Sequence, residues 1–387
     1  MNKCIYCNQE KNEIDFSLEH IFPDALGGSF LPQIFKTKSV CKKCNNLAGL
    51  YVDAPVINSF FASQLFLTNE YLGYYNFNNE PYIPFRYTGF ANDYIKHKDY
   101  DFCEMWLWFD GSKIYHFHNN SNDDFEFISG GDPRKRKNNK SAGEIYIVGI
   151  SNENYWIELL FKACLTKFKK SKIFLVNHLL KDNKKVHSEE QKRIINELFK
   201  TKDVKNSILN KLDFDVRFKA KLSLGLGFTL FGDSFIHSKE ATNLRDIFWN
   251  KDYKKLNKLK PAMNNFFKEN KDLDKLFKFF NIPGTHSLIF FKIDNSLILY
   301  ISLFGLNNFN LLTTITTELD KYHHPLVEKY SKGWGYVLVP QQEKIIGDFD
   351  IGALLAYNMD DKSFLPDLID LESSWISTDK LPSFNKK

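Results

Sequence analysis

Three segments near the start of the chain decide its fold: CIYC at residues 4–7, SLEHIFP at residues 17–23 and CKKCNN at residues 41–46. Each Cys-x-x-Cys pair turns two thiolates toward one point, and two such pairs supply the four soft ligands that tetrahedral zinc prefers. In a reducing cytosol, paired cysteines indicate metal binding more often than disulfides. The sequence therefore predicts a structural zinc ion bound by Cys4, Cys7, Cys41 and Cys44.

The zinc ion would also explain how so short a segment folds. The first 55 residues are rich in Cys, Asn and Gly, and their apolar content is too small to support a core without an additional cross-link such as a metal ion. A pair of redox-active Cys-x-x-Cys motifs is the alternative interpretation of the four cysteines.

Between the two cysteine pairs lies a distinctive pattern, in which an acidic residue precedes His-Ile-x-Pro at residues 19–23 and Leu-Gly-Gly follows at residues 26–28. Together with the closing Cys-x-x-Cys-Asn, this pattern resembles the HNH endonuclease family over about residues 1–55. The resemblance implies a ββα-metal fold, in which a hairpin carries the acid and the histidine. A helix beginning near the second cysteine pair would present the last metal ligand.

The resemblance also implies a role for each residue. His20 would be the general base that takes a proton from water, a task for which histidine is suited at cellular pH. Glu19 and Asn45 would hold a catalytic Mg²⁺ or Mn²⁺ ion, because hard cations prefer oxygen ligands. The alternatives are a packed core histidine at His20 and a helix N-cap at Asn45.

Two departures from the family pattern stand out. The family often has a middle Asn nine positions before its last ligand, and here that position is Lys36. The orienting role of the middle residue is therefore unassigned. Glu19 replaces the more common Asp, and Asn46 is a chemically equivalent neighbour of Asn45.

Basic residues are candidates for contact with nucleic acid. The net charge of +5 fits such a partner without requiring it. Residues 130–141 are expected to form an exposed basic loop, because they contain no apolar side chain. Such a loop could contact phosphate, and the alternative is that its charges only face solvent. The candidate contacts are Lys36, Lys42, Lys43, Arg134 and Arg136.

The remainder of the chain predicts an α+β fold. At 387 residues the chain is too long for one small core. Apolar residues at helical spacing after residue 55 place a domain boundary there. We expect a nuclease domain at 1–55 and an α+β region at 56–387, of one or two subdomains, for recognition, sensing or dimerisation. Helices are expected at residues 155–169, 188–200 and 216–231, and Ser188 with Gln191 forms a capping box.

Strands are expected in two groups. The first group consists of residues 105–109 and 113–117 around Asp110-Gly111, a strong hairpin turn, and of residues 144–150. The second group is 287–293, 297–303, 310–316 and 335–339. Aromatic residues of the first hairpin could stack on bases, but alternating aromatics on a strand more often fill a core. These residues are Trp106, Trp108 and Tyr115.

No second metal site is expected, because His286, His323, His324 and Cys164 have no partner at ligand spacing. The start of the chain lacks the apolar core of a signal peptide, and the apolar stretch 287–306 contains Lys and Asp. We therefore expect a cytoplasmic protein without a membrane partner.

The sequence as a whole predicts an endonuclease that acts on double-stranded DNA. Its expected setting is bacterial restriction or anti-phage defence, by analogy with other nucleases that carry a small HNH domain. One HNH site cuts one strand, so a double-strand break would need a homodimer. One alternative is a non-catalytic zinc module that only binds nucleic acid. Another is a nuclease that is activated by a nucleotide second messenger bound to the C-terminal region.

Overall fold

A computed structural model describes residues 2–57, 85–108, 112–119, 143–148, 154–168, 170–176, 188–200, 213–250, 279–305, 310–359 and 361–374. The described residues form two compact units: unit 1 holds residues 2–57 and 213–374, and unit 2 holds the described residues between 85 and 200. The N-terminal segment thus shares a unit with the described residues from 213 onward, which differs from the division expected at residue 55. The expected α+β class is confirmed.

The N-terminal segment begins with two short strands, β1 (Asn2–Lys3) and β2 (Glu10–Lys11). Strand β3 (Phe16–His20) then pairs antiparallel with β4 (Lys36–Cys41). Helix α1 (Lys42–Ala48) follows β4 directly. The chain continues through a π-helical turn over Gly49–Asp53 into α2 (Ala54–Ile57). The order β3, β4, α1 is the expected ββα arrangement.

Unit 1 is built around an antiparallel sheet with the order β12-β11-β10-β13-β14. Its strands are β10 (His286–Ile293), β11 (Ser296–Ser302), β12 (Asn310–Thr316), β13 (Gly333–Val339) and β14 (Lys344–Asp350). Four of these strands were predicted, and β14 was not, because its alternation of apolar and polar residues is interrupted by Gly347 and Asp348.

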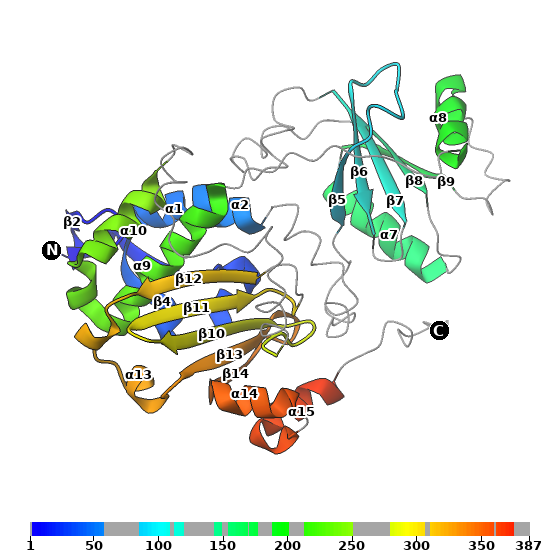
Figure 1. Ribbon diagram of the computed structural model, residues 1–387. Helices are drawn as coiled ribbons and strands as arrows, with labels where there is room; N and C mark the ends of the chain where they lie inside the picture. The colour runs from blue at the N-terminus through cyan, green and yellow to red at the C-terminus, as the bar shows by residue number, and fades with distance from the viewer. Residues whose placement is uncertain are drawn as a thin grey trace. The chain divides into compact units, whose positions relative to one another are not determined.

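Helices cover one face of this sheet (Figure 1). Alternate residues of the strands, such as Ile289, Tyr300 and Val337, form a buried cluster with the helices α14 (Ile351–Asn358) and α15 (Pro366–Ser373). Because successive side chains of a strand point to opposite faces, their neighbours are available to the other face.

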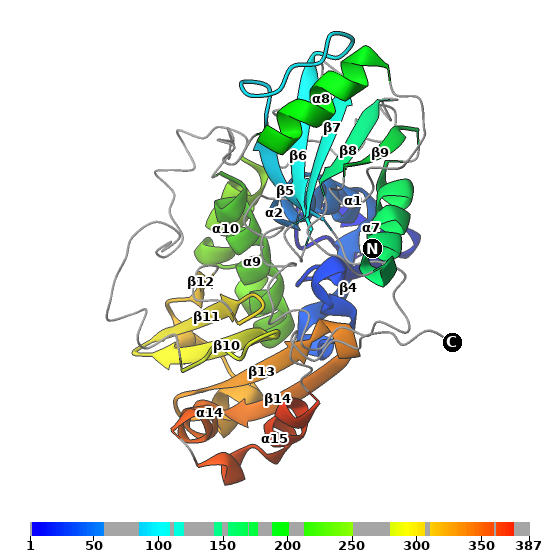
Figure 2. The ribbon, with the colours of Figure 1, turned by 90° about the vertical axis from the view of Figure 1, so that its right-hand side faces the viewer.

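The opposite face packs against the N-terminal segment and helix α9 (Asp213–Ile236), as both ribbon views show (Figures 1 and 2). The Phe35 ring lies 5.9 Å from that of Phe290, and Ser223 of α9 shares a 2.8 Å hydrogen bond with Thr313 of β12. Phe35 is fully buried, which contributes about 1.5–3 kcal/mol. The N-terminal segment is therefore part of the core of unit 1.

Unit 1 contains two further described helices. Helix α10 (Lys239–Trp249) follows α9 and packs against it, and its N-cap Ser238 accepts a hydrogen bond from Ala241. The short helix α13 (Pro325–Lys329) lies between β12 and β13 in the chain.

Unit 2 contains a second sheet with the order β5-β6-β7-β8-β9. Its strands are β5 (Arg86–Phe90), β6 (Phe102–Leu107), β7 (Lys113–His118), β8 (Glu144–Val148) and β9 (Lys172–Val176). The predicted hairpin of β6 and β7 is confirmed, while its turn residues lie outside the described ones. Strands β8 and β9 are parallel, which requires a crossover, and α7 (Asn154–Lys167) lies between them.

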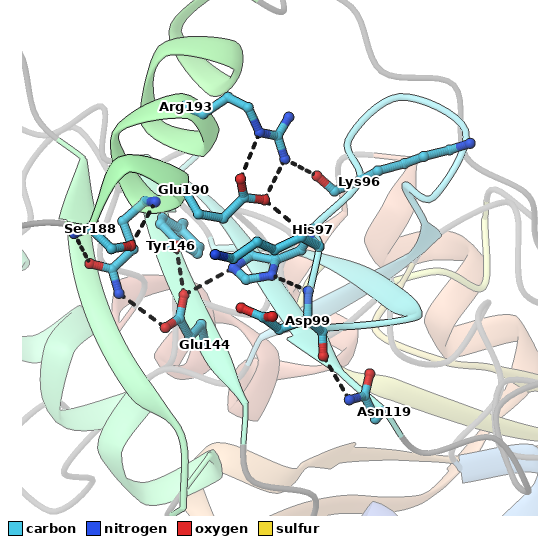
Figure 3. A network of polar contacts seen from close by, with 11 residues as sticks. Lys96, His97, Asp99, Asn119, Glu144, Tyr146, Ser188, Glu190 and Arg193 are labelled. Atoms are coloured by element: carbon cyan, nitrogen blue, oxygen red, sulfur yellow. Dashed lines mark hydrogen bonds and ion pairs between the residues drawn. The ribbon is translucent and has the colours of Figure 1, made fainter.

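Helix α8 (Glu189–Lys200) begins with the predicted capping box. The Ser188 N–H donates to Gln191 Oε1 at 3.0 Å, and the Gln191 N–H donates to Ser188 Oγ at 3.2 Å (Figure 3). The interpretation of the hairpin aromatics as stacking platforms is wrong, because all three are buried and cannot reach a base. These residues are Trp106, Trp108 and Tyr115.

Within the part of the chain that the structure describes, no helix has the length and apolar character needed to cross a membrane.

Candidate active site

The four cysteines of the N-terminal segment converge on one point. Their Sγ atoms all lie within 4.8 Å of one another, and the Cys41 N–H donates to Cys4 Sγ at 3.3 Å. A hydrogen bond from Cys44 outweighs burial and lowers the pKa of Cys4 to about 4. Burial raises the pKa of Cys7, and the hydrogen bond to Cys4 raises that of Cys44, so without an ion the cluster favours a single thiolate at Cys4. Four sulfur ligands at this spacing fit a tetrahedral zinc ion. The cluster consists of Cys4, Cys7, Cys41 and Cys44.

Helix α10 supports the first cysteine pair from the far end of the sequence. Arg245 Nε donates to the carbonyl of Ile5 at 2.9 Å, and Trp249 Nε1 donates to the carbonyl of Tyr6 at 2.8 Å. The Tyr6 ring also packs against Phe248, with 4.8 Å between ring centroids. The buried backbone of the cysteine knuckle is thus satisfied by side chains of unit 1.

Strand β3 ends in the two residues that the sequence singled out. Its register with β4 shifts between Ser17 and Glu19, and His20 then pairs with Lys36 across the hairpin. Because side chains alternate along a strand, Glu19 and His20 point to opposite faces. Glu19 is 2% exposed, whereas His20 is half-buried. The histidine therefore stays on the more accessible side of the hairpin.

The carboxylate of Glu19 is held by two side chains. Its Oε1 atom accepts a hydrogen bond from the Tyr6 hydroxyl at 3.1 Å and lies 2.8 Å from Lys221 Nζ. Lys221 comes from α9, and its Nζ also lies 2.6 Å from Asp53 Oδ2 and donates to the His20 carbonyl at 3.2 Å. One buried ammonium therefore connects the end of β3 with the π-helical turn that follows α1.

Burial and pairing oppose each other in this cluster. Burial raises the pKa of Asp53 to about 6, although the charge of Lys221 acts in the opposite direction. Burial also acts to lower the pKa of Lys221, but the charges of Asp53 and Glu19 prevail and raise it above its ordinary value. Lys221 is therefore charged in the folded protein.

Asn45 ties helix α1 to strand β3. Its Nδ2 group donates to Ser17 Oγ at 3.0 Å and to the carbonyl of Leu18 at 2.8 Å. Both hydrogen bonds use Nδ2, so Oδ1 is the atom that could bind a metal ion. The alternative role of Asn45 as an N-cap is wrong, because α1 begins at Lys42 and Asn45 lies inside it.

A comparison with known protein families identifies the family of the N-terminal segment. Residues 4–61 match the family model described as HNH endonuclease. These residues belong to the HNH endonuclease family. No curated protein and no solved structure matches the chain. A domain of this family supports hydrolysis of the nuclease type, and the family implies nucleic acid as the substrate class of the domain.

The basic residues near the HNH domain differ in how available they are. Lys42 and Lys43 are exposed on the first turn of α1. Lys36 is half-buried, and its ammonium donates to the carbonyl of Ser29 at 2.6 Å. Arg134 and Arg136 lie outside the described residues.

Sequence reasoning missed the residues that surround Glu19 in the HNH domain. Tyr6 lies between the first two cysteines, Asp53 lies after α1, and Lys221 lies in a stretch expected to be an apolar helix. The signal for Lys221 was present, because a lysine within an apolar helix is rarely buried without an acidic partner. Only the fold identifies which acids those partners are.

Proposed function

We propose that this protein is a metal-dependent endonuclease that hydrolyses phosphodiester bonds of DNA at its HNH domain. One observation carries the proposal. Asn45 binds through Nδ2 to the two residues that directly precede Glu19 and His20. The zinc-clamped helix therefore holds its candidate metal ligand beside the strand that carries the candidate base.

In this proposal, Asn45 Oδ1 and the Glu19 carboxylate hold Mg²⁺ or Mn²⁺. The contacts of that carboxylate with other described residues use Oε1, so we assign Oε2 as the proposed ligand atom. A hard divalent cation suits oxygen ligands, and when bound it polarises the scissile phosphate and stabilises the leaving oxygen. Lys221 has a positioning role, because it fixes Glu19 and the backbone carbonyl of His20 in place.

His20 acts as the general base and takes a proton from the attacking water. Its half-buried position at the end of β3 supports this role, since a base must remain accessible to water and substrate. Lys42 and Lys43 are exposed at the start of α1 and offset phosphate charge, and Lys36 lies across the hairpin from His20. We propose the same role for Arg134 and Arg136 in their basic loop.

Double-stranded DNA is the proposed substrate. The proposed setting is restriction or anti-phage defence in the bacterial cytoplasm, by analogy with other proteins in which a small HNH domain is attached to a large partner domain. A single HNH site cuts one strand, so we expect a homodimer where both strands are cut. A non-catalytic nucleic-acid-binding module is favoured only by Lys36, which occupies the position of the usual middle Asn.

Incubation of supercoiled plasmid with the full chain and Mg²⁺ or Mn²⁺ tests the proposal. Wild-type protein should nick the plasmid, and His20→Ala should reduce the rate by about 10²–10⁴-fold, the usual contribution of a general base. His323→Ala is the matched control, because the His323 side chain is 87% exposed and should be dispensable. Binding without nicking under either metal would overturn the nuclease and leave the binding module.

A further inference from the structure

Unit 2 contains a second cluster of metal-binding side chains, far along the sequence from the HNH domain. Glu104 of β6 lies directly across from His116 of β7, and Phe102 lies across from His118. Residues that face each other across an antiparallel pair share a face, and so do residues two apart on one strand. Glu104, His116 and His118 therefore project from the same face of the sheet.

The distances between these side chains match the requirements of a single ion. His116 Nδ1 lies 3.6 Å from Glu104 Oε2, and His118 Nε2 lies 3.6 Å from Glu104 Oε1. One ligand atom from each residue lies within 4.8 Å of the others. A tetrahedral zinc ion with bonds of about 2.0–2.2 Å separates its ligand atoms by about 3.3–3.6 Å. The three side chains would need little movement to bind it.

The surroundings of the cluster also fit ligands rather than a simple hydrogen-bonded group. At 3.6 Å the His–Glu distances exceed those of hydrogen bonds. His116 directs Nε2 to Ser171 Oγ at 3.2 Å, and among the described residues its buried Nδ1 has no hydrogen-bond partner. Trp106 Nε1 donates to Glu104 Oε2 at 3.1 Å. Metal ligands are commonly oriented by such outer hydrogen bonds.

A second His–Glu pair, drawn in Figure 3, provides a contrast. It lies on the opposite face of the sheet, because Glu144 pairs with Phe117, the neighbour of His116 and His118 along β7. His97 Nε2 lies 3.3 Å from Glu144 Oε2, and His97 Nδ1 accepts the Asp99 N–H at 3.1 Å. Glu144 also accepts hydrogen bonds from Tyr146 and Gln191. Both ring nitrogens of His97 are thus used within the protein, and this pair needs no ion.

We propose that Glu104, His116 and His118 bind one zinc ion in unit 2. Glu104 and His116 are 8% and 7% exposed, so a cation would neutralise a carboxylate that is largely removed from water. Two imidazoles and one carboxylate are a recurrent zinc ligand set, which leaves a fourth position for water or another ligand. This proposal does not depend on the nuclease activity, because none of its residues belongs to unit 1.

Metal analysis of the purified full chain after exhaustive dialysis tests the proposal. Wild-type protein should contain two zinc ions per chain, one in each unit. The double variant His116→Ala/His118→Ala should retain one, and the double variant Cys7→Ser/Cys44→Ser should lose the other. His97→Ala is the matched control, since it removes a buried histidine that packs against the same sheet, and it should retain two.

A milder variant keeps the test decisive if the double histidine variant does not fold. Glu104→Gln conserves the shape of the side chain but removes its charge, and it should weaken the second zinc site more than tenfold in a competition with a zinc chelator. The proposal is overturned if wild-type protein binds a single zinc ion that is lost with the cysteines. It is equally overturned if Glu104→Gln binds two zinc ions with unchanged affinity.

Discussion

The ammonium of Lys221 lies 2.8 Å from the carboxylate of Glu19, joining helix α9 to the strand that carries the candidate base. Removing one partner of a buried ion pair costs about 3–5 kcal/mol, because the remaining charge is left unpaired. We therefore expect Lys221→Met to lower the free energy of unfolding by about this amount in urea titrations. Glu19→Gln/Lys221→Met should recover part of the loss.

An exposed pair in the same unit provides the control for this cycle. Lys321 pairs with Glu318, and its side chain is 59% exposed, so Lys321→Met should produce no measurable change. Unchanged stability of Lys221→Met would contradict the assignment of Lys221 as the buried counter-charge of Glu19.

Asn45 and Asn46 should differ sharply in plasmid cleavage. Asn45→Ala removes the proposed ligand oxygen together with two hydrogen bonds to β3, so cleavage should fall at least 10²-fold. Asn45→Asp keeps an oxygen ligand and should retain part of the activity at raised Mg²⁺. Asn46 is exposed, and Asn46→Ala should cleave at the wild-type rate. The reverse ranking of the two alanine variants would transfer the ligand role to Asn46.

Loss of the zinc clamp should unfold the HNH domain. Cys4→Ser/Cys44→Ser removes two of four ligands and leaves a segment with too little core of its own. We expect protease digestion to cut this variant within residues 2–57, which should resist digestion in the wild type. Cys103→Ala is the control, because this cysteine lies in the core of unit 2. Equal resistance of all three proteins would exclude a structural role for the clamp.

Acid should destabilise unit 1 through His286. This residue is completely buried, and burial lowers its pKa from 6.5 to about 3. The unfolded chain therefore binds a proton between these values that the folded protein does not. The free energy of unfolding therefore has its full value, as far as His286 is concerned, above pH 6.5. It falls by about 1.4 kcal/mol per pH unit as the pH decreases from 6.5 toward 3.

A non-titrating variant isolates this contribution. His286 Nδ1 accepts the Phe304 N–H at 3.1 Å, and the amide oxygen of Gln can accept the same bond. His286→Gln should therefore show a flatter loss of stability than wild type between pH 6.5 and 4, measured by urea unfolding at each pH. Parallel curves for the two proteins would show that the buried imidazole does not account for the acid sensitivity.

Gly225 allows α9 to approach the end of β3. A Cβ atom at this position would lie 2.8 Å from two carbons of Ile21, so Gly225→Ala should cost about 1–3 kcal/mol through overpacking. At Gly49 a Cβ atom would meet no other atom within 4 Å, and the backbone has right-handed helical angles. Gly49→Ala should therefore stabilise the protein by about 0.5–1 kcal/mol. Similar thermal shifts in both variants would contradict the close approach.

Local patterns in the sequence predicted the elements that depend on neighbouring residues. The capping box of Ser188 and Gln191 involves residues three apart, and the β6–β7 hairpin has a short turn signal, so both could be identified without the fold. The zinc clamp was predictable because each cysteine pair is itself local. Helix α10 was missed, although Ser238 is a favoured N-cap residue, because its apolar stripe is narrow.

Interactions between distant segments could not be predicted in this way. The partners of Lys221 lie in β3 and after α1, and composition does not distinguish them from other acids. The two histidines of β7 were overlooked for the same reason. Their third neighbour, Glu104, belongs to another strand, and only the register of β6 with β7 brings it opposite His116.

The pairing of Asp53 with Lys221 has a consequence for how the gene can change. Among the described residues, unit 1 pauses in the sequence after Ile57 and resumes at Asp213. The ion pair joins the π-helical turn just before α2 to helix α9, close in the sequence to both of these points. The described residues of unit 2 thus lie in the sequence between two segments of unit 1 that are joined to each other, and domains inserted at such positions are tolerated by the host fold. A lineage could replace the inserted unit wholesale while inheriting the same cutting machinery.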